Sequence, residues 1–276
     1  MPFVFSEQHI TDYYHHGYTI FRGILPPSLI EEMRAAGAEL QVISIRERGA
    51  QNARSMPIAD VAEQLSPRAL QSFEDYLQMP ELVAAMQGVL GSEHSISGLG
   101  NIVLFFTDPV RPICQDWHRD MDEGYKGITT PAQRAEFRRL KQDPTFFVQV
   151  NCALHSDTCL WYVPGSAGRP NTRGELAAAG APYNGIDGRG KLIDAELDGQ
   201  SYAAQERISL EYCLSMPGGV NVVLEAGDYC LYRPIGWHTG NYAPHRQRLT
   251  LHHHVSTPAS IAWYVEWCRR MSAADA

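Results

Sequence analysis

The chain has 276 residues, of which 44% are hydrophobic and 20% are charged, and its formal net charge is −8. A chain of this length and hydrophobic content can bury a substantial core, and its composition does not indicate disorder. Nucleic acids and anionic membrane surfaces select for basic proteins, so the acidic balance argues against both as main partners.

Two further features bear on where the protein works. The sequence has no run of about 18 apolar residues and no N-terminal signal-peptide pattern, so we expect neither a membrane span nor a secretion signal. The 6 cysteines are scattered and include no CxxC pair, which predicts reduced thiols rather than a zinc site or disulfides. These features favour a cytoplasmic protein and leave open whether it forms a homo-oligomer.

The N-terminal third of the chain is predicted to be largely helical. Ile10 and Tyr13 recur at helical spacing, and Gly17 is a suitable C-terminal stop for that helix. Pro26 and Pro27 are typical of the first turn of another helix. The patterns predict a helix that ends at residue 17, a strand at 18–21, a helix that begins at 26–27, a loop or irregular helix at 41–66 and a helix at 80–90.

From about residue 96 onward, short β-rich runs follow one another with turn residues between them. Many short strands without intervening helices favour an antiparallel sandwich or barrel. Two polar insertions, at 121–145 and 165–205, interrupt this region; the first includes a helical pattern, and both are long enough to serve as lids. The predicted strands are 102–106, 146–154, 160–163, 208–214, 220–224, 229–233 and 249–255.

These elements predict a single domain over residues 1–276 that is mainly β with flanking helices. We expect its core to be a double-stranded β-helix, which is the jelly-roll or cupin-like barrel. A largely helical part (1–95) would pack on the jelly-roll core (96–258), and a C-terminal helix (259–276) would close the chain.

Residues 116–120 contain a His-x-Asp pattern. In an extended segment His118 and Asp120 point to the same face, because side chains alternate with period two. A third donor is available in His238, which follows the apolar run at 229–233. Two histidines and one carboxylate on one face of a metal leave three open positions, as in non-heme Fe(II) oxygenases. The pattern makes these three residues candidate iron ligands and a candidate catalytic centre, while spacing alone leaves open a chance His-x-Asp pattern and a structural role for His238.

Basic residues follow His238 near the start of the next strand. A dicarboxylate that chelates iron through one end needs a cation at its other end, and a guanidinium offers a carboxylate a planar two-point fork. Arg246 and Arg248 have the same parity, so both can face the barrel interior, and spacing alone does not choose between them. Gln149 and Asn151 also share parity, so they are candidates to hydrogen-bond the co-substrate or the substrate, and the alternative is that they are cross-strand partners.

Three consecutive histidines, His252, His253 and His254, suggest a second metal site at first sight. Adjacent residues of a strand point to opposite faces, so three in a row cannot bind one ion together. We interpret them as structural. Trp117 and Trp237, which flank two of the predicted iron ligands, are expected to pack behind the metal.

Motifs along nearly the whole chain resemble a known protein family. They are HHGYTI at 15–20, WHRD at 117–120, ALHSD at 153–157, LWYVPGS at 160–166, RP at 169–170, AGD at 226–228 and RQRL at 246–249. On these motifs the chain resembles the phytanoyl-CoA dioxygenase family of 2-oxoglutarate oxygenases. The run at 160–166 is the most specific of them.

The resemblance implies a jelly-roll fold, with His118, Asp120 and His238 as iron ligands and with 2-oxoglutarate and O2 as co-substrates. It implies Arg246 as the residue that binds the 2-oxoglutarate tail, since the leucines that follow then match apolar positions of the family. The interval from His238 to that arginine is shorter than is usual in the family, which keeps Arg248 as the alternative. Related halogenases replace the carboxylate with a small residue to admit chloride, so the presence of Asp120 disfavours halogenation.

The sequence thus predicts an Fe(II)- and 2-oxoglutarate-dependent dioxygenase that oxidises a small organic substrate and releases succinate and CO2. Hydroxylation is the expected outcome. Two alternatives stay open: a cupin-like metalloenzyme that does not use 2-oxoglutarate, and a non-catalytic binding protein of the same fold. The intact ligand set and the strand arginines count against both, and the sequence does not identify the substrate.

Overall fold

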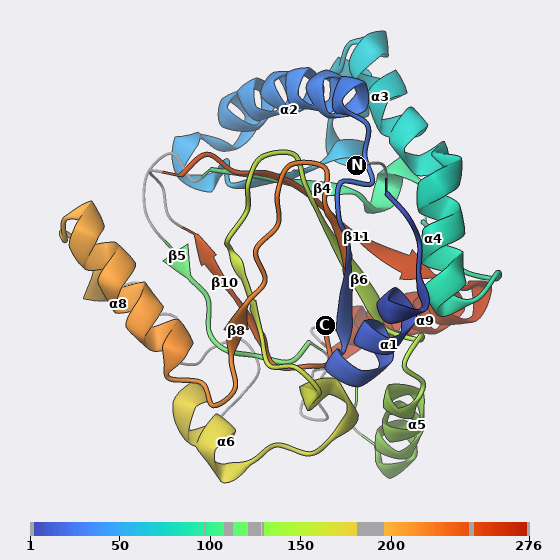
Figure 1. Ribbon diagram of the computed structural model, residues 1–276, viewed down its shortest axis with the longest axis vertical. Helices are drawn as coiled ribbons and strands as arrows, with labels where there is room; N and C mark the ends of the chain where they lie inside the picture. Colours follow the sequence, from blue (N-terminus) through green and yellow to red (C-terminus); the bar gives the residue numbers. More distant parts are fainter. Residues whose placement is uncertain are drawn as a thin grey trace.

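The computed structural model describes residues 3–96, 98–107, 113–120, 128, 130–180, 196–242 and 246–274. In this part of the chain, two antiparallel sheets form the core and helices surround them (Figure 1). The large sheet has the order β1-β9-β6-β11-β4-β2, with β3 paired to β11, and the small sheet has the order β5-β10-β7-β8. The strands are β1 (Tyr18–Phe21), β2 (Ser55–Pro57), β3 (Ser95–Ile96), β4 (Val103–Phe106), β5 (Ile113–Cys114), β6 (Val148–Ala153), β7 (Leu160–Tyr162), β8 (Val220–Asn221), β9 (Tyr229–Tyr232), β10 (His238–Tyr242) and β11 (Leu249–Ser256).

Alternation along the strands of the large sheet gives it two different faces. On β11, Leu249 and Leu251 point into the main hydrophobic core beneath the N-terminal helices. Arg248 and His252 have the opposite parity and line a cavity on the other face. On β6, Gln149 also lines that cavity, while the valines on either side of it belong to the core. The large sheet therefore presents polar side chains to the interior of the jelly roll.

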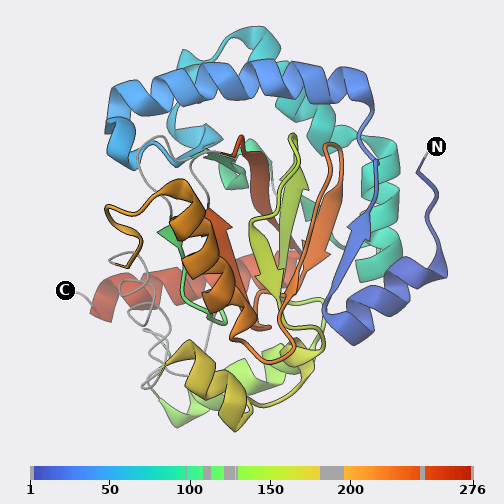
Figure 2. The same ribbon diagram turned by 60° about the vertical axis from the view of Figure 1, so that its left-hand side comes forward.

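The helices divide between the two sheets (Figures 1 and 2). Helices α1 (Glu7–His16), α2 (Pro27–Arg48), α3 (Pro67–Gln78) and α4 (Pro80–Leu90) contribute apolar side chains to the main core on the outer face of the large sheet. Helices α6 (Arg173–Ala179) and α8 (Tyr202–Leu214) pack with Trp117, Trp161 and Trp237 in a second core beside the small sheet. Helices α5 (Pro131–Gln142) and α9 (Pro258–Ala274) share a third, smaller cluster around Phe137 and Trp267.

The end of α1 supports the turn that leads into β10. Gly17 has a φ of +87°, and its N–H donates to Tyr13 O at 2.9 Å, which is a left-handed helix end that glycine adopts without strain. Gly17 O accepts from the N–H of Arg233 at 2.9 Å, and the Tyr162 hydroxyl donates to Arg233 O at 2.9 Å. A Cβ on Gly17 would lie 2.6 Å from that hydroxyl oxygen, so the junction leaves no room for a larger residue.

The arrangement of the sheets confirms the predicted fold class, mainly β with flanking helices and of jelly-roll type. Within the described residues the two sheets share no paired strand, so the barrel is not closed by a continuous ladder. The predicted helices at the N-terminus, at 80–90 and at the C-terminus are all present. The first insertion contains α5, as its pattern suggested, and part of the second (181–195) lies outside the described residues.

One predicted strand is wrong. Residues 208–214 belong to helix α8, although their apolar and polar side chains alternate as in a strand. The helix begins at Ser201, whose hydroxyl accepts from the N–H of Ala204, and the buried side chains that follow are spaced by one or two helical turns. Its buried residues are Gln205, Ser209, Tyr212 and Cys213.

Other elements go beyond what the patterns predict. Helix α2 continues to Arg48, so the segment expected as a loop or irregular helix at 41–66 begins eight residues late and contains the short strand β2. Helix α3 and strand β10 are not predicted at all. A Ser66 cap followed by Pro67 is the usual start of a helix and marks α3, whereas the polar sequence of β10 carries no strand signal.

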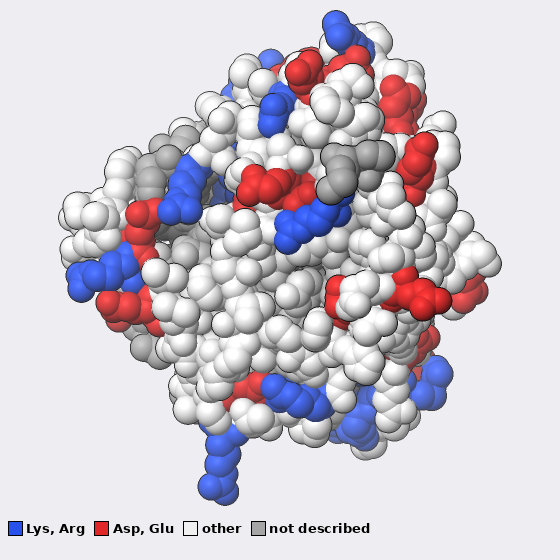
Figure 3. All heavy atoms as spheres, viewed as in Figure 1, with Lys and Arg blue, Asp and Glu red and all other residues white. Residues whose placement is uncertain are grey.

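The surface gives limited information about partners. None of the helices in the described residues is long and apolar enough to cross a membrane. On the face shown in Figure 3, acidic and basic side chains are interspersed around a broad uncharged centre. All six cysteines lie in the described residues, and none of them forms a disulfide bond.

We predict that Gly17→Ala destabilises the protein more than Gly23→Ala does. Both glycines have positive φ, but a Cβ on Gly23 meets no atom within 4 Å. Gly23→Ala should therefore cost only the backbone strain, about 1 kcal/mol, whereas Gly17→Ala adds the clash with Tyr162 and should cost about 3 kcal/mol. Chemical denaturation of both variants measures the difference, and equal losses would show that the Gly17 junction is not tightly packed.

Candidate metal centre

His118 and His238 face each other in an antiparallel bridge. The N–H of each residue donates to the carbonyl oxygen of the other, both at 2.9 Å. The N–H of Asp120 donates to Pro234 O at 2.9 Å, in the turn that precedes β10. Backbone hydrogen bonds therefore hold two segments that are distant in the sequence in a fixed register.

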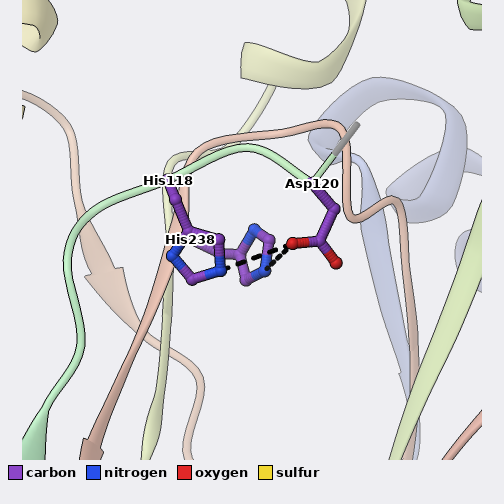
Figure 4. A group of neighbouring side chains, drawn as sticks. All are labelled: His118, Asp120 and His238. Atoms are coloured by element: carbon purple, nitrogen blue, oxygen red, sulfur yellow. Dashed lines mark ion pairs between the residues drawn. The ribbon is translucent and has the colours of Figure 1, made fainter. Parts of the chain in front are cut away.

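The three predicted ligands converge on one point beside this bridge (Figure 4). Asp120 Oδ1 lies 3.4 Å from His118 Nε2 and 3.8 Å from His238 Nε2. The two imidazole rings have centroids 4.2 Å apart, and the three ligand atoms all lie within 4.8 Å of one another. One small cation placed between them can contact all three.

Neighbouring carbonyl groups orient both imidazoles. His118 Nδ1 lies 2.6 Å from Asp116 O, and His238 Nδ1 lies 3.0 Å from Gly236 O. A carbonyl oxygen only accepts, so each Nδ1 carries the proton and donates it. Each Nε2 is then left with its lone pair directed at the common point, which is the tautomer a metal requires.

The pKa values of the group are also suited to binding a cation. Burial lowers the pKa of His238 to about 4, so this imidazole is neutral at pH 7. Burial opposes ionisation of Asp120, yet the hydrogen bond with His118 and the charges of the two imidazoles hold the pKa of this carboxyl below its usual range. Burial also favours neutral His118, but Asp120 outweighs it and raises the pKa of that imidazole. A metal at this position would take the place of the proton that lies between His118 Nε2 and Asp120 when the imidazole is charged.

A cavity of about 220 Å³ opens over the three side chains. Its walls include the inward face of the large sheet, with Gln149, Asn151, Arg248 and His252 among the polar side chains. Pockets for larger ligands usually measure about 300–1,000 Å³. The cavity therefore suits a compact polar molecule in contact with the metal.

Gln149 and Asn151 both line the cavity, as their shared parity predicts. In the described residues, however, both side chains hydrogen-bond to other side chains of the protein. The Gln149 amide donates to Asp120 Oδ2 at 2.7 Å, and Asn151 Oδ1 lies 3.0 Å from His252 Nδ1. Their proposed contact with co-substrate or substrate stays a prediction.

Arg248 lies in the same cavity as the three ligands. Its side chain is 10% exposed, and its Nε donates to Asp157 Oδ2 at 3.0 Å. The guanidinium carbon lies 5.0 Å from the ring centre of Phe105 and 4.5 Å from that of Tyr242, within cation–π range. Its Nη1 is buried and has no hydrogen-bond partner in the described part of the protein.

Arg246 lies outside that cavity. Its side chain is 57% exposed, and its Nη2 pairs with Glu206 Oε1 on α8 at 2.8 Å. It lines a neighbouring pocket that shares Arg248, Tyr242 and Cys159 with the cavity. The structure thus separates the two arginines that share parity in the sequence, because β11 begins only at Leu249 and the alternation does not extend back to Arg246.

The three consecutive histidines point to alternate faces. His252 and His254 lie over the inward face, beside Asn151 and Gln149 respectively. His253 points outward into the core, where its Nε2 lies 2.7 Å from the Tyr76 hydroxyl. Burial lowers the pKa of His253 to about 3.

Among the polar side chains that the sequence predictions did not assign to the site are His252, which lines the cavity, and Asp157, which pairs with Arg248. A parity argument that starts at Arg248 and continues along β11 would have found His252. Asp157 lies in a turn between β6 and β7, where neither period nor spacing assigns a role, although it belongs to one of the family motifs. Trp117 and Trp237 are fully buried in the core beside the small sheet, where we expected them.

Two imidazoles and one carboxylate that converge in a jelly roll, beside a buried guanidinium, define the class of mononuclear non-heme metal oxygenases. The model of one family, phytanoyl-CoA dioxygenase (PhyH), matches residues 13–242. The chain belongs to this family, which confirms the family predicted from the sequence. No curated protein sequence is significantly similar to the chain.

Several solved structures share the fold. AviO1 from Streptomyces viridochromogenes Tue57 is 17% identical, with a TM-score of 0.53 over 91% of this chain and 95% of that one. The epimerase SnoN, in complex with Fe3+, alpha ketoglutarate and nogalamycin RO, is 16% identical, with a TM-score of 0.54 over 91% of this chain and 83% of that one. EctD from S. alaskensis, with 2-oxoglutarate and 5-hydroxyectoine, is 14% identical, with a TM-score of 0.53 over 92% and 77%. At these identities the likeness establishes the fold.

We predict that His253→Gln reduces the loss of stability on mild acidification. The unfolded chain protonates His253 near pH 6.5, whereas the folded protein does so only near pH 3. The contribution of the neutral imidazole is therefore complete above pH 6.5 and is lost as the pH falls toward 3. Between pH 7 and 5 the wild type should lose on the order of 2 kcal/mol more than the variant. Urea unfolding at both pH values measures this, and parallel losses would contradict a buried neutral His253.

Proposed function

We propose that the protein is an Fe(II)- and 2-oxoglutarate-dependent oxygenase whose iron ligands are His118, Asp120 and His238. The observation that carries the proposal is the shared cavity: the three ligand atoms and the buried guanidinium of Arg248 line the same space. A metal site and a carboxylate site are thus within reach of one small molecule.

The donor set fits ferrous iron. Two neutral imidazoles and one carboxylate favour a borderline divalent ion, and three ligands on one side leave three positions for a chelating 2-oxoacid and for dioxygen. Iron bound here would supply dioxygen activation and the decarboxylation of 2-oxoglutarate to succinate and CO2. The protein's part is to place the ligands, the co-substrate and the substrate in contact.

We assign the tail of 2-oxoglutarate to Arg248 rather than Arg246. The Arg248 guanidinium lies over the rings of Phe105 and Tyr242, and its Nη1 has no hydrogen-bond partner in the described residues. A buried donor without a partner is unfavourable, so a carboxylate that accepts from it gains both the charge and the hydrogen bond. Arg246 already pairs with Glu206 at the surface. This assignment follows from cavity position, which outweighs the register suggested by the family motif.

We propose that the substrate is a small organic molecule. We also propose that the protein works in the cytoplasm. Hydroxylation is the default outcome in this proposal. The product depends on which C–H bond of the substrate is held nearest the metal. Among the structures of similar fold, SnoN is named as an epimerase, SnoK is named as a carbocyclase, and EctD was crystallised with 5-hydroxyectoine. The same site chemistry is therefore compatible with more than one oxidation.

The proposed function predicts a complex of the protein with Fe(II) and 2-oxoglutarate. Anaerobic addition of Fe(II) and 2-oxoglutarate to the purified protein should produce a visible metal-to-ligand charge-transfer band, and oxygen should then yield succinate. His118→Ala and Asp120→Ala should abolish both signals while the far-ultraviolet circular dichroism stays unchanged. If the wild type showed no charge-transfer band and made no succinate, the proposed function would be refuted. That result would favour a metalloenzyme that does not use 2-oxoglutarate, or a binding protein.

Substitution of each arginine in turn should show which of the two binds 2-oxoglutarate. Arg248→Lys keeps the charge but loses the planar fork, so the 2-oxoglutarate concentration at half-saturation of the charge-transfer band should rise about tenfold or more. Arg246→Lys serves as the matched control and should stay within about twofold of the wild type. The reverse result would return the co-substrate to Arg246.

A further inference from the structure

The carboxylate of Asp120 has two oxygen atoms in different surroundings. Oδ1 faces both imidazoles, at 3.4 Å from His118 Nε2 and 3.8 Å from His238 Nε2. Oδ2 accepts a hydrogen bond from the Gln149 amide nitrogen at 2.7 Å. One oxygen is thus directed at the metal position, and the other is held by the protein.

Gln149 is itself fixed by partners on both neighbouring strands. Its Oε1 accepts from the Tyr232 hydroxyl on β9 at 2.7 Å, and its amide nitrogen lies 3.2 Å from His254 Nε2 on β11. The side chain is 7% exposed. Because Asp120 and the neutral imidazole both need a donor, the amide nitrogen must face them and the amide oxygen must face Tyr232. The amide therefore has one satisfied orientation.

We infer that Gln149 is a positioning residue that makes Asp120 a one-oxygen ligand. This rests on the proposed function. A carboxylate free to rotate can bind a divalent ion through both oxygens, which fills one of the positions that a chelating 2-oxoacid and dioxygen require. The amide opposes this by holding Oδ2 away from the metal, so three positions stay open.

The inference changes the expected role of Gln149. Its parity predicts a contact with 2-oxoglutarate or substrate, but both amide hydrogens and the amide oxygen already have protein partners. Asn151, the next inward residue of β6, contacts His252 and not a metal ligand. Of these two neighbours on one strand, only Gln149 acts on the metal through a ligand.

The inference is tested by measuring the metal affinity of variants in the absence of co-substrate and of turnover. Gln149→Met keeps the length of the side chain and removes its hydrogen bonds, and loss of such an outer partner costs metal affinity about 10–100-fold. Anaerobic titration with Fe(II), and with Co(II) as an air-stable probe, should show this loss. The Co(II) ligand-field spectrum should also change, because the second oxygen of Asp120 becomes free to bind.

Two further variants keep the test decisive. Tyr232→Phe removes only the hydroxyl that orients the amide, so metal affinity should fall by a smaller factor, about threefold to tenfold. Asn151→Leu is the matched control and should leave both the metal affinity and the Co(II) spectrum at wild-type values. If Gln149→Met should fail to fold, Tyr232→Phe carries the same test.

The outcomes separate this inference from the proposed function. Wild-type affinity and spectrum in Gln149→Met and Tyr232→Phe would overturn the positioning role, and so would an equal loss in Asn151→Leu. Both results leave the oxygenase proposal standing if the wild type forms the charge-transfer complex. A wild type that binds neither metal would instead refute the proposed site, and the inference with it.

Discussion

The reciprocal pair of backbone hydrogen bonds between His118 and His238 is the constraint on which the site depends. These bonds belong to the main chain, so they fix the position of two ligands independently of which side chains surround them. The bridge also brings Asp120 beside the turn at Pro234, where its own N–H is held. A jelly roll places these two segments on adjacent strands, which explains how residues far apart in the sequence form one cation site.

The two sheets contribute different kinds of control. The small sheet and its extensions carry the histidines, and local carbonyl groups set their tautomers. The large sheet contacts the carboxylate through Gln149 and supplies the buried Arg248 on the same inward face. The small sheet thus holds the two histidines, and the large sheet contacts the carboxylate beside them. Packing that holds the sheets together, such as the Gly17 junction, therefore also bears on the geometry of the metal position.

The convergence of His118, Asp120 and His238 was predictable because each of these residues follows a local rule. His118 and Asp120 share a face through the period of an extended segment, and His238 follows a recognisable apolar strand. The fold class followed from the succession of short strands, whereas residues 208–214 misled because the apolar and polar side chains of this part of helix α8 alternate as in a strand. The choice between Arg246 and Arg248 could not be made from parity, since parity holds only inside a strand and β11 starts after both. Contacts across strands, such as Gln149 with Asp120, have no sequence signal.

The pairing of Arg248 with Asp157 bears on how a dicarboxylate would be held. A lone buried guanidinium would be costly without its co-substrate, and the Asp157 carboxylate offsets that cost. The same carboxylate accepts from the Thr250 hydroxyl and from the N–H of Cys159, so it is fixed before any ligand arrives. Because it accepts from Nε, the opposite edge of the guanidinium stays available. In the complex that we propose, the tail carboxylate of 2-oxoglutarate would accept from Arg248 Nη1, so Asp157 and the co-substrate would share one guanidinium without competing for the same N–H.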